Sequence, residues 1–268
     1  MNTMAGSLSD YAENAILDHL LMRTTFTQPT NLYVGLSTST IADASTGGAC
    51  GETTGTDYLR VVMNTWDVAS SRATENTNVV TFAEAGGDWG TITDWFVVDA
   101  TVDGNIIAYG TFSTEKAVGT GDNASIAAGG IDISVDSGGM STYLANEILD
   151  HVFKTGEFGM PAALYVGLST STIADATSGD ACGEVTGTNY SRKQCDTWTT
   201  AAAGSLENVA AITFDIASGS WGTVTDFFIA DATADGNILF YETADASKVV
   251  GTNDTVQFDA EAFTISLD

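Results

Sequence analysis

Two short stretches of the chain carry acidic and amide side chains at a spacing that suits a hard cation. The first set is Asp99, Asp103 and Asn105, and the second, 132 residues further on, is Asp231, Asp235 and Asn237. Carboxylate and amide oxygens are the ligands that calcium prefers, although this spacing lacks the alternating ligands and final glutamate of an EF-hand. A metal-free hairpin turn is the alternative, because Asp-Gly supplies the positive φ angles that such turns need. The sequence therefore predicts either a calcium site or a plain turn, and no other cofactor.

The histidines offer little material for catalysis. His19 and His151 are the two histidines of the sequence and occupy equivalent positions of a repeat, so a Ser-His-Asp arrangement would have to exist twice with one histidine each. No GxSxG, HExxH, P-loop or dinucleotide motif occurs. Acidic residues are so numerous that any carboxylate pair chosen for glycosidase chemistry would be arbitrary. We therefore predict that the protein is not an enzyme and that the histidines cap or pack helix ends.

The cysteines and tryptophans are predicted to pack in the core. The odd number of cysteines and the lack of a CxxC pair argue against a disulfide framework or structural zinc, and favour buried thiols. The tryptophans would suit sugar-stacking platforms, but their large apolar area more often closes a small core. The residues concerned are Cys50, Cys182, Cys195, Trp66, Trp89, Trp95, Trp198 and Trp221.

Arginine is scarce and is predicted to anchor the fold. The chain has 8 basic and 35 acidic residues, so each arginine has many carboxylates to choose from. Arg60 follows Tyr58 by two residues, which places both side chains on one face of an extended segment. We expect Glu52 to be their partner, and the equivalent Glu184 to pair with Tyr190 and Arg192.

The whole chain is a tandem repeat. Residues 32–44 recur without a change as residues 164–176, and the same offset relates the two halves without a gap. We call residues 5–136 the first unit and residues 137–268 the second unit. Each has the usual size of a domain, so we predict two equivalent domains joined by a short linker over residues 135–140.

Each unit is predicted to open with one helix and to continue as short strands. Ser9 or Asp10 can cap a segment with apolar residues at helical spacing. The following runs, rich in β-branched and aromatic residues and separated by turn-forming residues, are 32–36, 58–66, 78–82, 92–98, 106–112 and 131–135. The predicted fold is mainly β: two tandem antiparallel β-sandwich domains, each with one N-terminal α-helix.

Charge and hydropathy exclude several classes of function. The formal net charge is −27 and no basic stripe occurs, so nucleic acid is not an expected partner. No apolar run is long enough to span a membrane, and the first ten residues do not resemble a secretion signal. We expect a soluble, self-repelling acidic surface; adaptation to high salt or docking on a basic partner is the alternative.

An ordered string of motifs resembles a known family. Leu32 to Ser39 comes first and is followed by Gly51-Glu52, Trp89 to Thr93, Gly104-Asn105 and Gly121-Asp122, and the second unit repeats most of the string in the same order. This order resembles tailed-bacteriophage virion structural proteins of the tail-fibre type, which include domains that decorate capsids. The resemblance implies a non-catalytic building block of the virion, without a family active site.

The expected function follows from the repeat and from the resemblance together. A duplicated domain offers two similar faces in fixed relation and can bridge neighbouring sites of a symmetric particle. We therefore expect self-assembly and contacts with capsid or tail proteins in a virion assembled in the host cytoplasm. A calcium- or carbohydrate-binding adhesion module outside phages is the alternative.

Overall fold

The computed structural model describes residues 6–135, 139–154 and 158–267. The described elements of the first unit are β1 (Ser7–Leu8), α1 (Asp10–Leu20), β2 (Tyr33–Ser37), β3 (Val61–Val62), β4 (Ala73–Glu75), β5 (Val80–Glu84), β6 (Gly90–Val98), β7 (Ile106–Val118), β8 (Asn123–Ile126) and β9 (Asp132–Ser134). Those of the second unit are α2 (Thr142–Phe153), β10 (Tyr165–Ser169), β11 (Lys193–Gln194), β12 (Ser205–Glu207), β13 (Ile212–Thr213), β14 (Gly222–Ala230), β15 (Ile238–Val250), β16 (Gln257–Phe258) and β17 (Thr264–Ser266).

Both helices begin where a serine can cap them. The Ser9 hydroxyl accepts a hydrogen bond from the Ala12 N–H, and the Ser141 hydroxyl does the same for Leu144, at 3.1 Å in the second case. Such a bond satisfies one of the free N–H groups of the first turn. The predicted cap at Ser9 or Asp10 is therefore confirmed at Ser9.

Each unit is built on one antiparallel sheet with smaller strand pairs beside it. The order is β1-β7-β6-β2-β3 in the first unit and β11-β10-β14-β15 in the second. The smaller pairs are β4-β9, β5-β8, β12-β17 and β13-β16. This arrangement confirms the mainly β, antiparallel fold with one helix at the start of each unit.

Glycine on β2 allows an aromatic ring to lie against the sheet. Gly35 is paired with Phe96, and a Cβ atom on Gly35 would lie 2.2 Å from the Phe96 ring. Gly167 and Phe228 repeat this contact at the same distance. A larger residue is therefore excluded at Gly35, and the Arg60 guanidinium group lies over the Phe96 ring, 5.2 Å from its centre.

The segment 58–66, predicted as one strand, is a strand only at Val61–Val62. Before this strand the Tyr58 N–H bonds to the nearby Gly55 carbonyl, and after it the Met63 N–H still bonds across to the Leu32 carbonyl at 2.8 Å. The ladder therefore extends little beyond the two residues of β3. The short strands β1, β4 and β8 were not predicted, and β1 precedes the helix that was expected to open the first unit.

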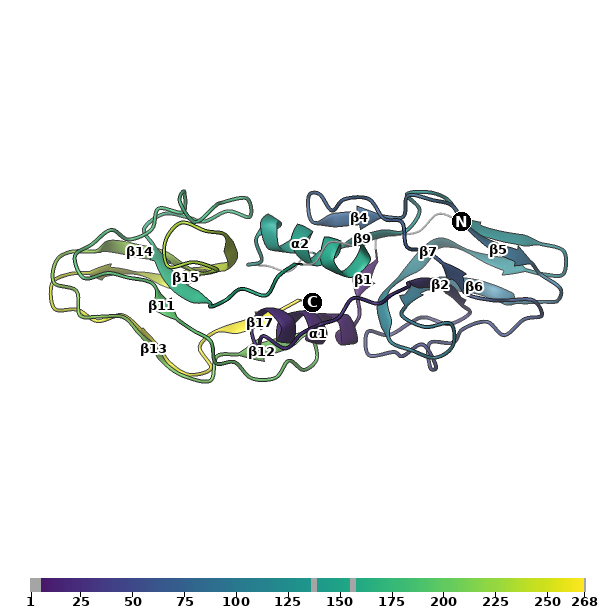
Figure 1. Cartoon of the computed structure of the whole chain (residues 1–268), viewed down its shortest axis with the longest axis horizontal. Helices are drawn as coiled ribbons and strands as arrows, with labels where there is room; N and C mark the ends of the chain where they lie inside the picture. The colour runs from purple at the N-terminus through teal and green to yellow at the C-terminus, as the bar shows by residue number, and fades with distance from the viewer. Residues whose placement is uncertain (1–5, 136–138, 155–157, 268) are drawn as a thin grey trace.

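The two helices lie between the sheets of the two units, in the middle of an elongated molecule (Figure 1). Helix α1 packs against β12 of the second unit, and α2 packs against β4 of the first. Buried residues of both units form one continuous hydrophobic core.

The predicted linker lies partly outside the described residues, and the domain limits 5–136 and 137–268 stay a prediction. Neither described helix has the length and apolar character of a membrane-spanning segment.

Candidate functional site

A buried arginine organises a polar cluster in each unit. The Arg60 side chain is 2% exposed and forms a two-pronged pair with Glu52, with Nε–Oε1 and Nη2–Oε2 distances of 2.8 and 2.7 Å. Its remaining N–H groups donate to the carbonyls of Ala100, Asp103 and Gly47 at 2.8 to 3.0 Å. Since an arginine has five N–H donors, every one of them is used.

The tyrosine before this arginine completes the cluster. The Tyr58 hydroxyl donates to Glu52 Oε1 at 2.9 Å and accepts from the Leu36 N–H at 2.8 Å. Burial, and then the Glu52 charge, raise the pKa of Tyr58 well above its usual range. Burial alone would lower the pKa of Arg60, but the hydrogen bonds and charge of Glu52 raise it. The tyrosine thus stays neutral and the arginine charged.

The same cluster recurs in the second unit. Arg192 forms its two-pronged pair with Glu184 at 2.8 and 2.7 Å, and the Tyr190 hydroxyl donates to the same carboxylate. The guanidinium groups cover aromatic rings, with Arg192 4.9 Å from the Phe228 ring centre. The predicted partners of both arginines are therefore confirmed. Because all its groups are satisfied internally, this cluster anchors loops and offers no free acid, base or nucleophile.

The six residues considered for calcium lie at the hairpins that these arginines hold. Asp99 accepts from the Asn105 N–H at 2.7 Å and from the Asn105 side-chain amide at 2.8 Å, so each carboxylate oxygen has a partner. Asp103 and Gly104 have φ angles of 51° and 79°, as the turn requires. The structure thus brings Asp99 and Asn105 together, while the Asp103 main-chain carbonyl bonds to Arg60.

The second hairpin has the same geometry. Asp231 accepts twice from Asn237, both at 2.8 Å, and Asp235 has a φ of 52°. A turn accounts for all these contacts without a metal ion. Calcium binding at the hairpins stays a prediction, which calorimetric titration of the chain with calcium would test.

The histidines lie at the junction of the two units. The His19 and His151 rings stack with their centres 5.1 Å apart. Each Nδ1 accepts a main-chain N–H bond, from Phe26 and Phe158 respectively, at 3.1 Å. The predicted packing role is confirmed, but contact between the two histidines was not foreseen because it joins residues 132 positions apart.

The thiols and indoles are buried, as predicted. Cys50, Cys182 and Cys195 are free and buried, and every tryptophan is at most 4% exposed. Burial raises the pKa of the Cys195 thiol to about 12, with a smaller contribution from the Asp196 charge. The tryptophans therefore line no exposed sugar platform.

The raised thiol pKa predicts that stability falls at high pH. An unfolded chain releases the Cys195 proton near pH 9.0, whereas the folded chain keeps it until about pH 12. The stabilising contribution is thus complete below pH 9.0 and is lost as the pH rises through this window, at roughly 1 kcal/mol per pH unit. Urea unfolding at pH 8 to 11 measures the loss. Cys195→Met, with the residue found at the equivalent Met63, should show a shallower decline, and equal slopes in the two proteins would contradict the assignment.

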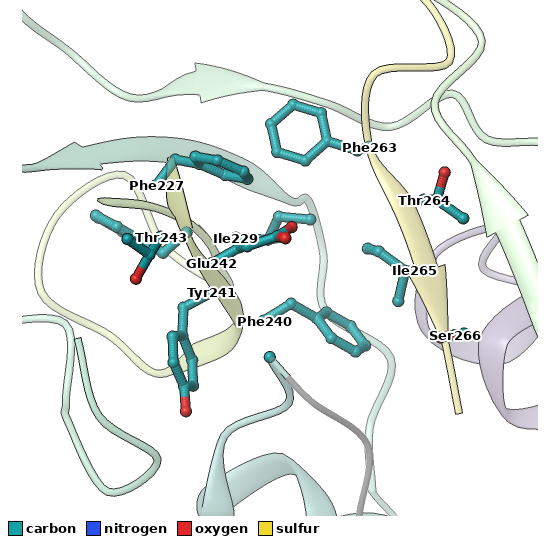
Figure 2. A pocket seen from close by; sticks show the side chains of 12 residues that line it. Phe227, Ile229, Phe240, Tyr241, Glu242, Thr243, Phe263, Thr264, Ile265 and Ser266 are labelled. Atoms are coloured by element: carbon teal, nitrogen blue, oxygen red, sulfur yellow. The ribbon is translucent and has the colours of Figure 1, made fainter. Parts of the chain in front are cut away.

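The second unit contains a pocket at a place where its aromatic residues differ from those of the first unit. Phe227, Phe240 and Phe263 line a hollow of about 460 Å³ beside Glu242 (Figure 2). The equivalent of Phe227 is Trp95, which is fully buried in the first unit. In the first unit the Trp95 ring lies against Gly6 and Gly110, whereas Glu242 stands at the position of Gly110 in the second unit, so the two units differ here in shape and in charge.

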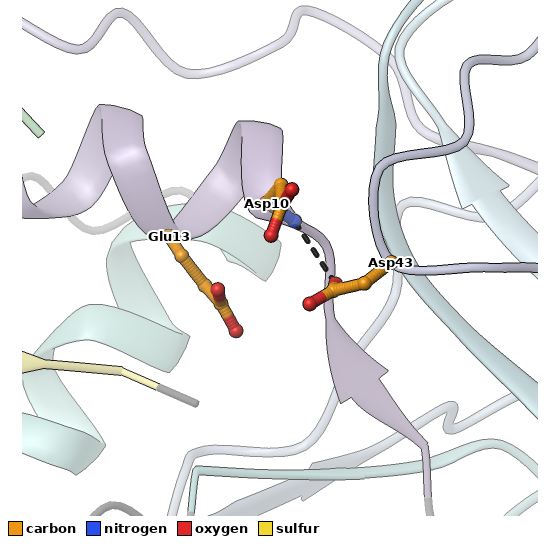
Figure 3. A group of neighbouring side chains, drawn as sticks. All are labelled: Asp10, Glu13 and Asp43. Atoms are coloured by element: carbon orange, nitrogen blue, oxygen red, sulfur yellow. Dashed lines mark hydrogen bonds between the residues drawn. The ribbon is translucent and has the colours of Figure 1, made fainter. Parts of the chain in front are cut away.

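Three carboxylates meet at the start of α1. Asp10, Glu13 and Asp43 each contribute one carboxylate oxygen, and these three oxygens lie within 4.8 Å of one another (Figure 3). The Asp10 N–H also donates a hydrogen bond to the Asp43 carboxylate at 3.0 Å. We call these residues the acidic cluster. Hard oxygen ligands of this kind suit a divalent cation. The cluster was not predicted from the sequence, because Asp43 lies far from the helix along the chain.

The comparison with known families decides what kind of protein this is. A family model described as Gp80, podophage GP4 fiber I protein gp80, matches residues 7–134 and again residues 139–266. The chain belongs to this family of phage fibre proteins. The match to the Gp80 family model confirms both the tandem duplication and the resemblance to virion proteins. The chain is therefore a structural component of a phage particle. No curated protein matches the chain.

Proposed function

We propose that the chain is a non-enzymatic, surface-exposed module that assembles on the capsid or on the tail of the phage. The observation that carries the proposal is the double match to the Gp80 fibre family. The two arginine clusters support it, since Arg60 and Arg192 pair with Glu52 and Glu184 and hold loops in place. Side chains used in this way build a scaffold and leave no acid-base pair free for turnover.

The arrangement of the units supports a bridging role. Their sheets lie at opposite ends of the molecule, with the helices between them (Figure 1). Similar surfaces therefore face away from each other, so one chain can contact two neighbouring sites of a symmetric particle. The partners in this proposal are capsid or tail proteins and further copies of the chain, brought together in the host cytoplasm.

The net charge gives the proposal a measurable signature. A charge of −27 opposes contact between copies at low ionic strength and favours contact with a basic surface. Self-assembly should weaken as salt is removed, whereas docking on a basic virion protein should weaken as salt is added. Co-sedimentation of the purified chain, alone and with particles that lack it, measures both dependences.

Antibody labelling of particles tests the assignment directly. Negative-stain images of purified virions labelled with an antibody against this chain should show label at one defined location, either the capsid surface or the tail. Particles made without the chain should lose the label. Intact particles that never carry the chain, together with hydrolysis of a polysaccharide by the purified protein, would contradict the proposal.

A carbohydrate-binding role is the second candidate, and the pocket of the second unit is the observation that favours it. Aromatic walls beside a carboxylate are suited to stacking and hydrogen bonding with a small ligand. A glycan array with the wild-type chain and with Phe240→Ala distinguishes the two roles. Binding that disappears in the variant would favour adhesion, whereas absence of binding to any glycan would remove this candidate.

A further inference from the structure

Equivalent residues of the two units contact each other in reciprocal pairs. The Asp150 side chain on α2 accepts a hydrogen bond from the Ala69 N–H of the first unit at 2.8 Å. The Asp18 side chain on α1 accepts from the Ala201 N–H of the second unit, also at 2.8 Å. Asp18 and Asp150 are equivalent, as are Ala69 and Ala201. Each unit therefore supplies both the acceptor and the donor of one contact.

A second pair of contacts repeats this reciprocity. Asn146 accepts from the Arg72 N–H at 2.9 Å, and the equivalent Asn14 accepts from the Gly204 N–H at 3.0 Å. Both donors lie in tight turns, with φ angles of 69° and 65°. The matching contacts show that the junction has approximate two-fold symmetry, as in a dimer of identical subunits.

The stacked histidines lie where the symmetry axis must pass. His19 and His151 are equivalent residues that touch each other, which in a two-fold interface happens only close to the axis. Because each Nδ1 accepts an N–H bond, the proton of the neutral ring is on Nε2. That Nε2 donates across the junction, from His19 to the Phe158 carbonyl at 3.2 Å and from His151 to the Phe26 carbonyl at 3.3 Å.

The junction also has an apolar centre of the kind found in stable dimers. Ile16, Leu20, Ile148 and Leu149 of the two helices are at most 3% exposed and belong to the core shared by both units. The Phe153 ring of α2 packs 4.9 Å from Trp66 of the first unit. Interfaces that hold subunits together permanently are apolar in this way.

The symmetry is broken at the two ends of the junction. At one end Arg72 pairs with Asp175 at 3.1 Å. At the other end the equivalent of Arg72 is Gly204, and a Cβ atom there would lie 2.4 Å from the Glu13 carboxylate. The acidic cluster of the first unit thus faces a glycine, while the arginine of the first unit faces Asp175. The first unit thus carries both Arg72 and Glu13, which would form a charge pair, but in this junction they lie at opposite ends and do not meet.

We propose that the junction is a self-complementary interface, so that either unit binds a second copy of itself in the same geometry without the covalent linker. In a pair of first units, Arg72 of each copy would lie against Glu13 and Asp43 of the other. The Glu13 carboxylate is the far end of a flexible side chain and can move to accept the guanidinium group. Pairs of first units therefore gain charge contacts that pairs of second units, with Gly204 and Ala145 at these positions, lack.

The experiment uses the full chain with a protease recognition sequence in place of residues 136–138. After cleavage, the two halves should still elute together at the size of the uncut chain. The cut protein is then dissolved in urea and dialysed, and native mass spectrometry counts the pairs formed. First–first and second–second pairs should appear beside first–second pairs. Halves that separate at micromolar concentration, or refolding that yields only first–second pairs, would overturn the proposal.

An Arg72→Gly variant tests the charge argument. It gives the first unit the residue that the second unit has at this position, and second–second pairs, which contain no residue 72, serve as the internal standard. The ratio of first–first to second–second pairs should drop about five-fold, as expected for the loss of two partly buried ion pairs. An unchanged ratio would show that the arginine plays no part in the pairing.

Discussion

Replacing Arg60 with alanine should lower the free energy of unfolding by about 3 kcal/mol. The substitution leaves the Glu52 carboxylate, which is 22% exposed, without its cation, and removes donors from the Ala100, Asp103 and Gly47 carbonyls. Buried acceptors without partners cost more than the hydrogen bonds contributed. Urea unfolding followed by tryptophan fluorescence measures the change, because Trp89 lies close to Tyr58.

Three further variants separate the possible causes of this loss. Arg60→Lys keeps the charge but not the planar fork, so it should recover only part of the stability. Arg192→Ala should cost about as much as Arg60→Ala, because the second cluster has the same contacts. Lys116→Ala removes an exposed cation on β7 and should change stability by less than about 0.5 kcal/mol. Equal losses for the Lys116 and Arg60 variants would show that net charge, and not the cluster, determines the effect.

Features set by neighbouring residues could be predicted from the sequence. The cap at Ser9, the positive φ of Asp103 and Gly104, and the pairing of Arg60 with Glu52 each depend on groups within a few residues of one another. Local hydrogen bonding and backbone preference decide such contacts. The repeated order of helix and strands could be predicted because the two units have similar sequences without a gap between them.

Features set by contacts between the units could not be predicted. The apolar face of α1 indicated that the helix is buried, but not that β12 of the other unit covers it. A hydrophobic face is satisfied by any complementary surface, because the hydrophobic effect is not directional. For the same reason His19 was assigned to packing without its partner, His151. The choice of partner depends on contacts that only the assembled fold provides.

The pocket of the second unit lies beside two positions at which the units differ. In the first unit a Cβ atom on Gly110 would lie 2.5 Å from the Trp95 ring, so the indole requires glycine there. In the second unit Glu242 stands at the position of Gly110, and Phe227 at that of Trp95. A smaller ring and a larger side chain thus occur together. The two positions are 15 residues apart along the chain, and only the sheet register places Trp95 opposite Gly110.

This pairing predicts a strong coupling between the two positions. Gly110→Glu alone should destabilise the chain by about 3 kcal/mol or more, because it forces a carboxylate and extra atoms into a filled, buried space. Trp95→Phe alone should cost about 1 to 3 kcal/mol through the cavity that it leaves.

The double variant Trp95→Phe/Gly110→Glu reproduces the pair found in the second unit. Its loss of unfolding free energy should be about 2 kcal/mol smaller than the sum of the two single losses, a coupling of the size seen between residues in contact. Urea unfolding of the four proteins of this cycle measures the coupling. The reverse change, Phe227→Trp with Glu242→Gly, should fill the pocket and raise stability by about 1 kcal/mol. Strict additivity in the first cycle would show that the two positions do not share the space, and that the pocket has another cause.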